Sequence, residues 1–515
     1  MPKNLIDICK EGDCKMFREM IADGAEDINM TDNEGETSLY IACYKGYLEI
    51  VEMCINAGAN INHAGKRGET PLIAAIHYGN LQIVELCINA GANINHMTKY
   101  GQTPIYVAVV QNRVGLIRTL IDAGADIDKD DTDGKTPVNI ATTYGRKNIV
   151  RIFIEEGADL NKRDEFGETP LYRSSTLGDD LELVEMFITA GADINLANDD
   201  GESPLYVASH EGNTETVRLL INAGAKVDQT TRSGHTPFFA ASNRGHVEII
   251  KMLLDKGADI DKANDDGETP LLIATFHGYY EVTRLCLEAG SDVNQTDGDG
   301  FPAIYYASNG GHLPIVKLFI ESGAFVNKMS TYGKTALFAA SEKGYLEIVE
   351  TLINSGADLN LSSKNTRAAM PLYAACEAGR IEMVKLHIKY GANVNLSSRY
   401  DPGDTPFYIA CRRGYFEIAK LLLQNNANIL LKDSQDRTPL DVAKTDKIKK
   451  LILKEYRWYR CRPLFMTRPH SDHETNKDHK LKPLGRIITA RIDNNDPSSR
   501  DEVLNQLKLE IASYL

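Results

Sequence analysis

The stretch GETPLIAAIHYGN, residues 68–80, together with the apolar run that follows it as far as residue 95, decides the fold of this chain. It has the pattern of two short helices joined by turns. Thr70 is a favourable N-cap, and Pro71 suits the first helical position, where its missing N–H costs nothing, so one helix is predicted to begin here. Gly79 is predicted to end that helix.

The apolar run after Gly79 predicts a second helix. Asn80 can cap its N-terminus, its apolar residues recur on one face, and Gly91 can adopt the positive φ that ends a helix. Neither helix is long enough to be stable alone in water, and each has only one apolar face to bury. The pair therefore needs copies of itself on both sides.

Such copies occur along most of the chain. A closing glycine, or finally an asparagine, recurs mostly at steps of 33 residues, at Gly58, Gly91, Gly124, Gly157, Gly191, Gly224, Gly257, Gly290, Gly323, Gly356, Gly391 and Asn426. A Thr-Pro pair opens the first helix of most copies, at 70–71, 103–104, 136–137, 169–170, 236–237, 269–270, 405–406 and 438–439.

A 33-residue period that combines GxTPL, GxxxIV and GADIN resembles the ankyrin repeat family, over roughly residues 4–455. The resemblance implies an all-α solenoid of stacked helix-turn-helix units with hairpin-like fingers, built as a curved rod. We assign residues 1–30 to an N-terminal capping repeat, 31–429 to the repeat array and 430–456 to a C-terminal capping repeat. The last helix of that cap is predicted to end before Tyr456.

The repeat is lost after residue 456. Residues 457–498 contain too few apolar side chains to fold alone, and we interpret them as a basic, histidine-containing linker or an extended segment on the stack. In residues 499–515, Ser499 and Glu502 have capping-box spacing ahead of apolar residues on one face. This pattern predicts a short amphipathic helix.

The cysteines and the apolar runs indicate the compartment. There are 9 cysteines and no CxxC pair, and six of the cysteines occupy apolar helix positions: Cys43, Cys54, Cys87, Cys286, Cys376 and Cys411. This usage predicts a reducing environment without disulfides. The start of the chain lacks a signal-peptide pattern, and no run of about 18 apolar residues occurs. We expect an intracellular, cytoplasmic protein without a membrane span, and the sequence leaves a nuclear location open as an alternative.

The charge is distributed unevenly along the chain. The net charge is −15; residues 1–360 carry 30 basic and 54 acidic groups (−24), and residues 361–515 carry 27 and 18 (+9). Because polyanions are bound through Lys and Arg, the acidic part disfavours nucleic acid and anionic membranes. The basic end could still contact them.

No catalytic pattern is present, so the chain is predicted not to be an enzyme and to need neither a cofactor nor a small-molecule substrate. Phosphate-binding loops, nucleophile elbows and HExxH are all missing from the sequence. Cys461, His470, His473 and His479 are ligand types that zinc accepts. Their spacing matches no zinc module, so we interpret them as linker residues and predict no metal.

Three features of the repeats bear on packing and modification. An aromatic residue follows the Thr-Pro position in most repeats, which predicts buried aromatic side chains between first helices: Tyr40, Tyr106, Tyr172, Tyr206, Phe239, Tyr305, Phe338, Tyr373 and Tyr408. Pro302-Ala303 and Ala336 depart from Thr-Pro, which predicts a softer stack from 297 to 340. The resemblance implies that Asn360 matches a hydroxylation pattern; the interpretation we favour is that it bonds the turn backbone.

The family resemblance implies a non-enzymatic, protein-binding scaffold that binds a protein partner through its concave face and finger tips. We expect a monomer. Two alternatives stay open. One is a substrate-capturing adaptor of the ubiquitin-ligase type that uses the C-terminal residues 504–515, and the other is a regulatory array of an enzyme complex.

Aromatic and Arg side chains at finger tips are the candidate partner-binding residues, because they anchor interfaces and have no packing role there. They are Tyr100, Phe166, Tyr332, Arg367, Arg399 and Tyr400. We place the main surface from Tyr332 to Arg413, where two fingers are lengthened and the charge turns positive, and expect an acidic or phosphorylated partner. The alternative is that the long fingers are tolerated insertions.

Overall fold

The computed structural model describes residues 4–24, 27–178, 180–361, 370–397 and 403–465. These residues form helices and turns, and their β-structure is limited to isolated bridges of Thr31 with Thr37 and of Thr296 with Pro302. The chain divides into two units between Lys449 and Lys450. None of the described helices has the length and apolar character needed to cross a membrane.

The first unit contains consecutive pairs of short helices. The first helices of the pairs are α1 (Leu5–Glu11), α3 (Ser38–Lys45), α5 (Pro71–Tyr78), α7 (Pro104–Val110), α9 (Pro137–Thr143), α11 (Pro170–Thr176), α13 (Pro204–Glu211), α15 (Pro237–Arg244), α17 (Pro270–His277), α19 (Ala303–Gly310), α21 (Ala336–Lys343), α23 (Pro371–Glu377) and α25 (Pro406–Arg413). The second helices are α2 (Cys14–Ala22), α4 (Leu48–Asn56), α6 (Leu81–Asn89), α8 (Val114–Asp122), α10 (Lys147–Glu155), α12 (Leu181–Thr189), α14 (Thr214–Asn222), α16 (Val247–Asp255), α18 (Tyr280–Glu288), α20 (Leu313–Glu321), α22 (Leu346–Asn354), α24 (Ile381–Lys389) and α26 (Phe416–Gln424).

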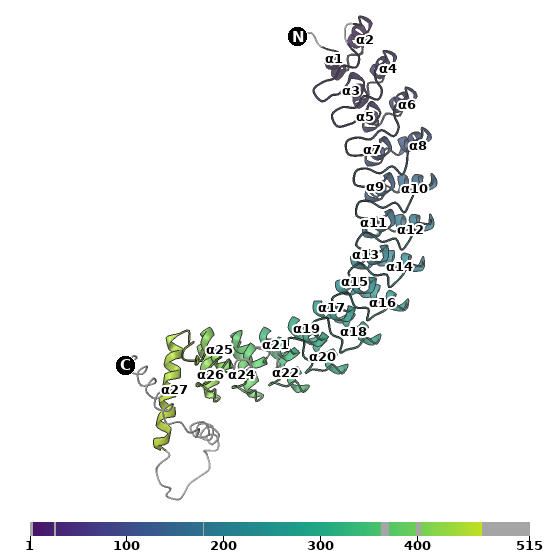
Figure 1. Cartoon of the computed structure of the whole chain (residues 1–515). Coiled ribbons are helices and arrows are strands. Elements are labelled where there is room, and N and C mark those ends of the chain that lie inside the picture. Colours follow the sequence, from purple (N-terminus) through teal and green to yellow (C-terminus); the bar gives the residue numbers. More distant parts are fainter. Residues whose placement is uncertain (1–3, 25–26, 179, 362–369, 398–402, 466–515) are drawn as a thin grey trace. The chain divides into compact units, whose positions relative to one another are not determined.

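Neighbouring pairs stack in register. Each first helix contacts the next first helix, each second helix contacts the next second helix, and Figure 1 shows the two rows with the connecting fingers beside the first helices. In α5, all residues from Pro71 to Ile76 are buried, whereas α6 buries one face with Ile83, Val84 and Cys87. The core therefore lies between successive pairs, and the predicted all-α solenoid is confirmed.

The N-caps of the first helices mostly form as predicted. The capping hydroxyl accepts a hydrogen bond from the backbone N–H three residues on at Thr37, Thr103, Thr136, Thr169, Ser203, Thr236, Thr269, Thr335 and Thr405. Thr70 holds the N-cap position of α5, but its buried hydroxyl makes no cap hydrogen bond. The predicted cap of α6 is confirmed, because Asn80 Oδ1 accepts from Gln82 N at 2.9 Å.

The predicted helix stops have the left-handed backbone that they require. Gly79 has φ 90°, Gly91 has φ 84°, and Asn426, which replaces a glycine, has φ 66°. Glycine is also needed for space in the fingers. A Cβ on Gly101 would lie 2.6 Å from the backbone nitrogen of Thr132 in the next finger, closer than packed atoms can approach.

The cysteines predicted at apolar helix positions are all fully buried: Cys43, Cys54, Cys87, Cys286, Cys376 and Cys411. The sulfurs of Cys43 and Cys87 lie 3.7 Å apart, and both residues are free thiols. Burial raises the pKa of Cys286 to about 12, so this thiol is protonated at neutral pH. These residues serve as small apolar side chains of the core.

The last helix is longer than the sequence predicted. Instead of ending before Tyr456, α27 (Asp446–Phe465) continues through residues that we had assigned to a linker. No Gly or Pro lies between Asp446 and Arg462, so the chain contains no helix stop there. The predicted helix at 499–515 lies outside the described residues, and the domain boundaries stay predictions.

Candidate functional site

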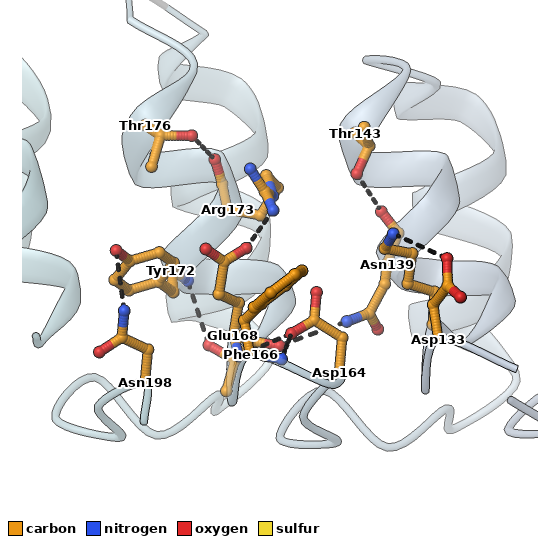
Figure 2. Close-up of polar contacts among 12 residues, drawn as sticks. Asp133, Asn139, Thr143, Asp164, Phe166, Glu168, Tyr172, Arg173, Thr176 and Asn198 are labelled. Carbon is orange, nitrogen blue, oxygen red and sulfur yellow. Dashed lines mark hydrogen bonds and ion pairs between the residues drawn. The ribbon is translucent and has the colours of Figure 1, made fainter. Parts of the chain in front are cut away.

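The fingers that connect the helix pairs are tied by side-chain acceptors at their first residue. In the fifth full repeat, counted from the one that opens at Asp32, Asp164 Oδ1 accepts hydrogen bonds from the backbone of Phe166 at 3.0 Å and Glu168 at 2.9 Å (Figure 2). The same pair of bonds forms at Asp32, Thr98, Asp131, Asn198, Asn264, Asp297 and Asp433. The turn of each of these fingers is therefore fixed locally.

Successive fingers are also bonded to each other through the backbone. Asp199 N–H donates to Phe166 O at 3.0 Å, Thr132 N–H donates to Tyr100 O at 3.3 Å, and Thr331 N–H donates to Asp299 O at 3.0 Å. These bonds hold neighbouring finger tips in a fixed register. Together with the first helices, the fingers form one surface of the first unit, which we call the finger face.

Three of the predicted binding residues lie on this face with exposed rings. The exposed fractions are 63% for Tyr100, 57% for Phe166 and 50% for Tyr332. They belong to the third, fifth and tenth full repeats, so the structure does not bring them together. Tyr332 has an aromatic neighbour, because its ring stacks on Phe301 with 5.9 Å between centroids.

The other three predicted binding residues, Arg367, Arg399 and Tyr400, lie outside the described residues. Two of the described arginines nearby are engaged within the protein. Arg413 pairs with Glu377 at 2.6 Å, and the guanidinium of Arg412 lies 5.9 Å from the centroid of the Tyr408 ring. The positive surface predicted from Tyr332 to Arg413 stays a prediction.

The first-helix aromatic residues are buried as predicted, except Tyr206, which is half-buried. Sequence reasoning missed that several of the tyrosines bond a carboxylate of the following repeat. Tyr172 Oη donates to Glu202 at 2.7 Å. Figure 2 shows the second partner of this hydroxyl, Asn198 Nδ2, at 3.2 Å. Burial, followed by the bond to Glu202, raises the pKa of Tyr172 well above its usual value. These tyrosines are structural links between repeats, because their hydroxyls are already paired.

The same link recurs where a Tyr and an acid occupy matching positions of adjacent repeats. Tyr40 Oη donates to Glu69 at 2.5 Å at this position, whereas Tyr408 Oη donates at 2.5 Å to Asp433, the first residue of the following finger. Glu69 and Glu202 directly precede the Thr-Pro or Ser-Pro pair of the next repeat. An acidic residue directly before Thr-Pro or Ser-Pro, in the repeat that follows a first-helix tyrosine, is the sequence pattern that could have predicted the bonds to Glu69 and Glu202.

Asn360 has a structural partner in the next repeat. Its Oδ1 accepts a hydrogen bond from Asn393 N–H at 2.8 Å. The same bond is made by Asn29, Asn62, Asn95, Asp128, Asn161, Asn195, Asp228, Asn294, Asn327 and Asn395. Asn360 thus bonds a turn backbone as we favoured, although that backbone belongs to the following repeat.

The described residues contain no group of three or more His, Cys, Asp or Glu side chains that could hold a metal ion. The tail residues considered as metal ligands, His470, His473 and His479, lie outside the described residues, as does the side chain of Cys461.

Comparison with known proteins agrees with the geometry. A family model described as ankyrin repeats in three copies matches overlapping segments at residues 5–98, 57–131, 78–164, 114–198, 174–264, 224–297, 271–363 and 361–433. The chain belongs to the ankyrin repeat family. Ankyrin repeats are in general protein–protein interaction modules. No curated protein matches the chain.

A similar solved structure is the ankyrin repeat domain of Bcl-3, described as a unique member of the IkappaB protein family. It is 29% identical in sequence, with a TM-score of 0.40. The match covers 43% of the present ankyrin chain and 99% of the Bcl-3 domain.

Proposed function

We propose that the protein is a non-enzymatic, intracellular scaffold that binds a protein partner through the concave face of its ankyrin array and the finger tips. The observation that carries the proposal is the exposure of aromatic rings on tied fingers. Phe166 is 57% exposed although its backbone is bonded on both sides, to Asp164 within the finger and to Asp199 in the next one. Its ring adds nothing to the core.

Exposed aromatic rings on a rigid backbone are suited to anchoring an interface. Burying a side chain such as Phe stabilises a complex by about 1.5–3 kcal/mol, and a fixed backbone reduces the entropy lost on binding. Several other fingers carry acids or small residues at their tips, such as Asp199-Asp200 and Asp265-Asp266. The aromatic tips therefore differ from the acidic or small tips of these other fingers, although their rings add no packing to the core.

Within this proposal, the surface from Tyr332 to Arg413 is our candidate for an acidic or phosphorylated partner. The lengthened fingers would supply Arg367, Arg399 and Tyr400, and a standard interface needs about 800 Å² from each partner, which a few adjacent repeats can offer. The protein is proposed to act as a monomer.

Affinity purification of the full chain, followed by mass spectrometry, tests the proposal. One variant changes Arg367, Arg399 and Tyr400 to Ala, and a second changes Tyr100 and Phe166 to Ala. We expect wild type to recover a defined set of proteins and at least one variant to lose members of it while keeping the helical circular-dichroism spectrum. An identical set for wild type and both variants would contradict binding through these tips.

A further inference from the structure

Four aromatic side chains from three consecutive repeats meet on the finger face. Phe276 at the end of α17 contacts Tyr306 of α19 edge-on at 5.8 Å between centroids, Phe301 lies 6.2 Å from Tyr306, and Phe301 stacks on Tyr332 at 5.9 Å. We call Phe276, Phe301, Tyr306 and Tyr332 the aromatic cluster. Aromatic pairs at these separations attract each other, so the rings form one continuous surface.

The aromatic cluster is open to solvent at both of its ends. Phe276 is 51% exposed and Tyr332 is 50% exposed, whereas Phe301 and Tyr306 are half-buried. Phe276 is not among the buried residues of α17 and is half exposed, so its ring is on the solvent side of that helix. A contiguous exposed apolar surface of this kind marks an interaction site more strongly than a single exposed ring does.

Hydrogen bonds around Asp297 hold the rings in place before any partner binds. Asp297 Oδ1 accepts from Phe301 N–H at 2.8 Å, and its Oδ2 accepts from the hydroxyl of Tyr306. The Tyr332 hydroxyl donates to Asp299 Oδ1 at 3.3 Å. The rings of Tyr306 and Tyr332 are therefore each oriented by a carboxylate at the hydroxyl, and Asp297 also fixes the backbone of Phe301, which lowers the ordering cost of binding.

The charge is negative on the eighth- and ninth-repeat side of the aromatic cluster, whereas the finger of Tyr332 carries Lys334. The fingers and first helices of the eighth and ninth full repeats, residues 264–277 and 295–310, contain no Lys or Arg and five acidic residues: Asp265, Asp266, Glu268, Asp297 and Asp299. Asp265 and Asp266 are exposed at the finger tip. A ligand that covers these rings must therefore tolerate or neutralise carboxylates on their eighth- and ninth-repeat side.

We infer that the aromatic cluster binds a basic, arginine-containing segment of a protein partner. A guanidinium stacks on aromatic faces and at the same time donates paired hydrogen bonds to carboxylates, so it fits a surface that offers both. Lys supplies only a compact charge and should bind less well, and an acidic or nucleic-acid ligand is repelled. The inference rests on the proposed protein-binding function and names the chemistry of one partner.

Fluorescence anisotropy with three synthetic peptides tests this inference on the full chain. The labelled peptides share one Gly-Ser-Leu scaffold and carry Arg, Lys or Glu at the same positions. We expect the Arg peptide to bind more tightly than the Lys peptide and the Glu peptide not to bind. Equal affinity for the Arg and Glu peptides, or no binding of the Arg peptide, would overturn the inference.

A pair of matched variants assigns the binding to the aromatic cluster. Phe276→Ala combined with Tyr332→Ala removes the two exposed rings and is expected to weaken Arg-peptide binding by about tenfold or more. The control is Phe325→Ala, because Phe325 is 63% exposed in the turn after α20 of the ninth repeat and lies outside the cluster. Unchanged affinity of the double variant, or an equal loss in the control, overturns the assignment.

A second pair separates the local carboxylates from the overall negative charge. Asp265→Asn with Asp266→Asn should weaken Arg-peptide binding more than Glu347→Gln with Glu350→Gln on α22, although both pairs change the net charge equally. Equal losses would show non-specific attraction and overturn the site. The proposed function is tested separately by the affinity purification. It is contradicted if the wild-type protein recovers no protein partner. If Phe276→Ala/Tyr332→Ala still recovers a partner, only the inference about the aromatic cluster is contradicted.

Discussion

The finger face of the eighth and ninth full repeats differs from that of the eleventh and twelfth, although both are built on the same backbone. In the former, Phe276 is exposed, Phe301 and Tyr306 are half-buried, and the fingers and first helices carry acidic residues but no Lys or Arg. In the latter, Tyr373 and Tyr408 are buried and Arg413 is paired with Glu377. The position in the repeat thus decides whether a ring packs inward or stays exposed, and the residue type at the exposed positions decides whether they offer an aromatic surface.

The largest expected effect compares a buried tyrosine with an exposed one. Tyr408 is 1% exposed and bonds Asp433, whereas Tyr332 is 50% exposed. Tyr408→Ala should lower the free energy of unfolding by about 3–5 kcal/mol, because it leaves a cavity and removes one of the hydrogen-bond donors to buried Asp433. Tyr332→Ala should change it by less than about 0.5 kcal/mol. Urea denaturation followed by circular dichroism measures both, and similar losses would remove the distinction between the two kinds of site.

Acid should weaken the C-terminal repeats through a buried histidine. His387 in α24 is fully buried, its Nε2 lies 2.7 Å from Ser341 Oγ, and burial lowers its pKa to about 4. The unfolded chain, with a pKa of about 6.5, then takes up a proton that the folded chain does not, so stability present above pH 6.5 is lost as the pH falls toward 4. The loss should reach about 3 kcal/mol.

His387→Leu provides the control for this pH dependence. In this variant the free energy of unfolding should depend less on pH between 6.5 and 4. Only the pH dependence that comes from other titrating groups should remain. Urea midpoints measured across this range for both proteins check the expectation, and an unchanged slope in the variant would assign the acid sensitivity to other groups.

A smaller effect concerns the N-cap of α19, which carries the aromatic cluster residue Tyr306. Pro302 occupies the cap position without a side-chain hydrogen bond, whereas Thr335 caps α21 in the next repeat. Replacing Pro302 by Thr and Ala303 by Pro should restore the common cap and raise the free energy of unfolding by about 1 kcal/mol. Hydrogen exchange should be fastest among internal repeats within residues 297–340 of wild type and slower there in the variant. Uniform exchange along the array would contradict a soft segment.

The smallest effect concerns the ion pair of Arg413 and Glu377. Their side chains are 50% and 37% exposed, so solvent screens the pair. Glu377→Gln should cost less than about 1 kcal/mol of stability but should leave the positive charge of Arg413 available on the finger face. Binding of an acidic peptide, measured by anisotropy at low and high salt, should increase only at low salt. An increase that persists at high salt would argue against a charge effect.

Much of the fold could be predicted because its signals are local. Asn80 as a cap, Gly91 as a stop and Cys87 as a core residue each follow from a few neighbouring positions, and each is found in the structure. The end of α27 was missed, since no Gly or Pro lies between Asp446 and Arg462 and we had relied on the loss of the repeat pattern instead.

The candidate site was less predictable, since its contacts join residues about one repeat apart. Tyr332 was recognised as an exposed tip, but its stacking on Phe301 and the link through Tyr306 to Phe276 depend on how three repeats align. Glu202 as the acceptor for Tyr172, and Asn393 N–H as the donor to Asn360, were missed for the same reason.

The sequence by itself determined the period, the helix boundaries within each repeat and the uneven charge, because caps, glycine turns and apolar spacing act over less than one repeat. Only the tertiary structure decided which side chains of neighbouring repeats meet, because that depends on the register of the stacked pairs. Tyr408, whose hydroxyl reaches Asp433, and Tyr332, whose ring stays exposed, are the same residue type in adjacent parts of the array. Their roles differ because one lies between stacked helices and the other at the tip of a finger.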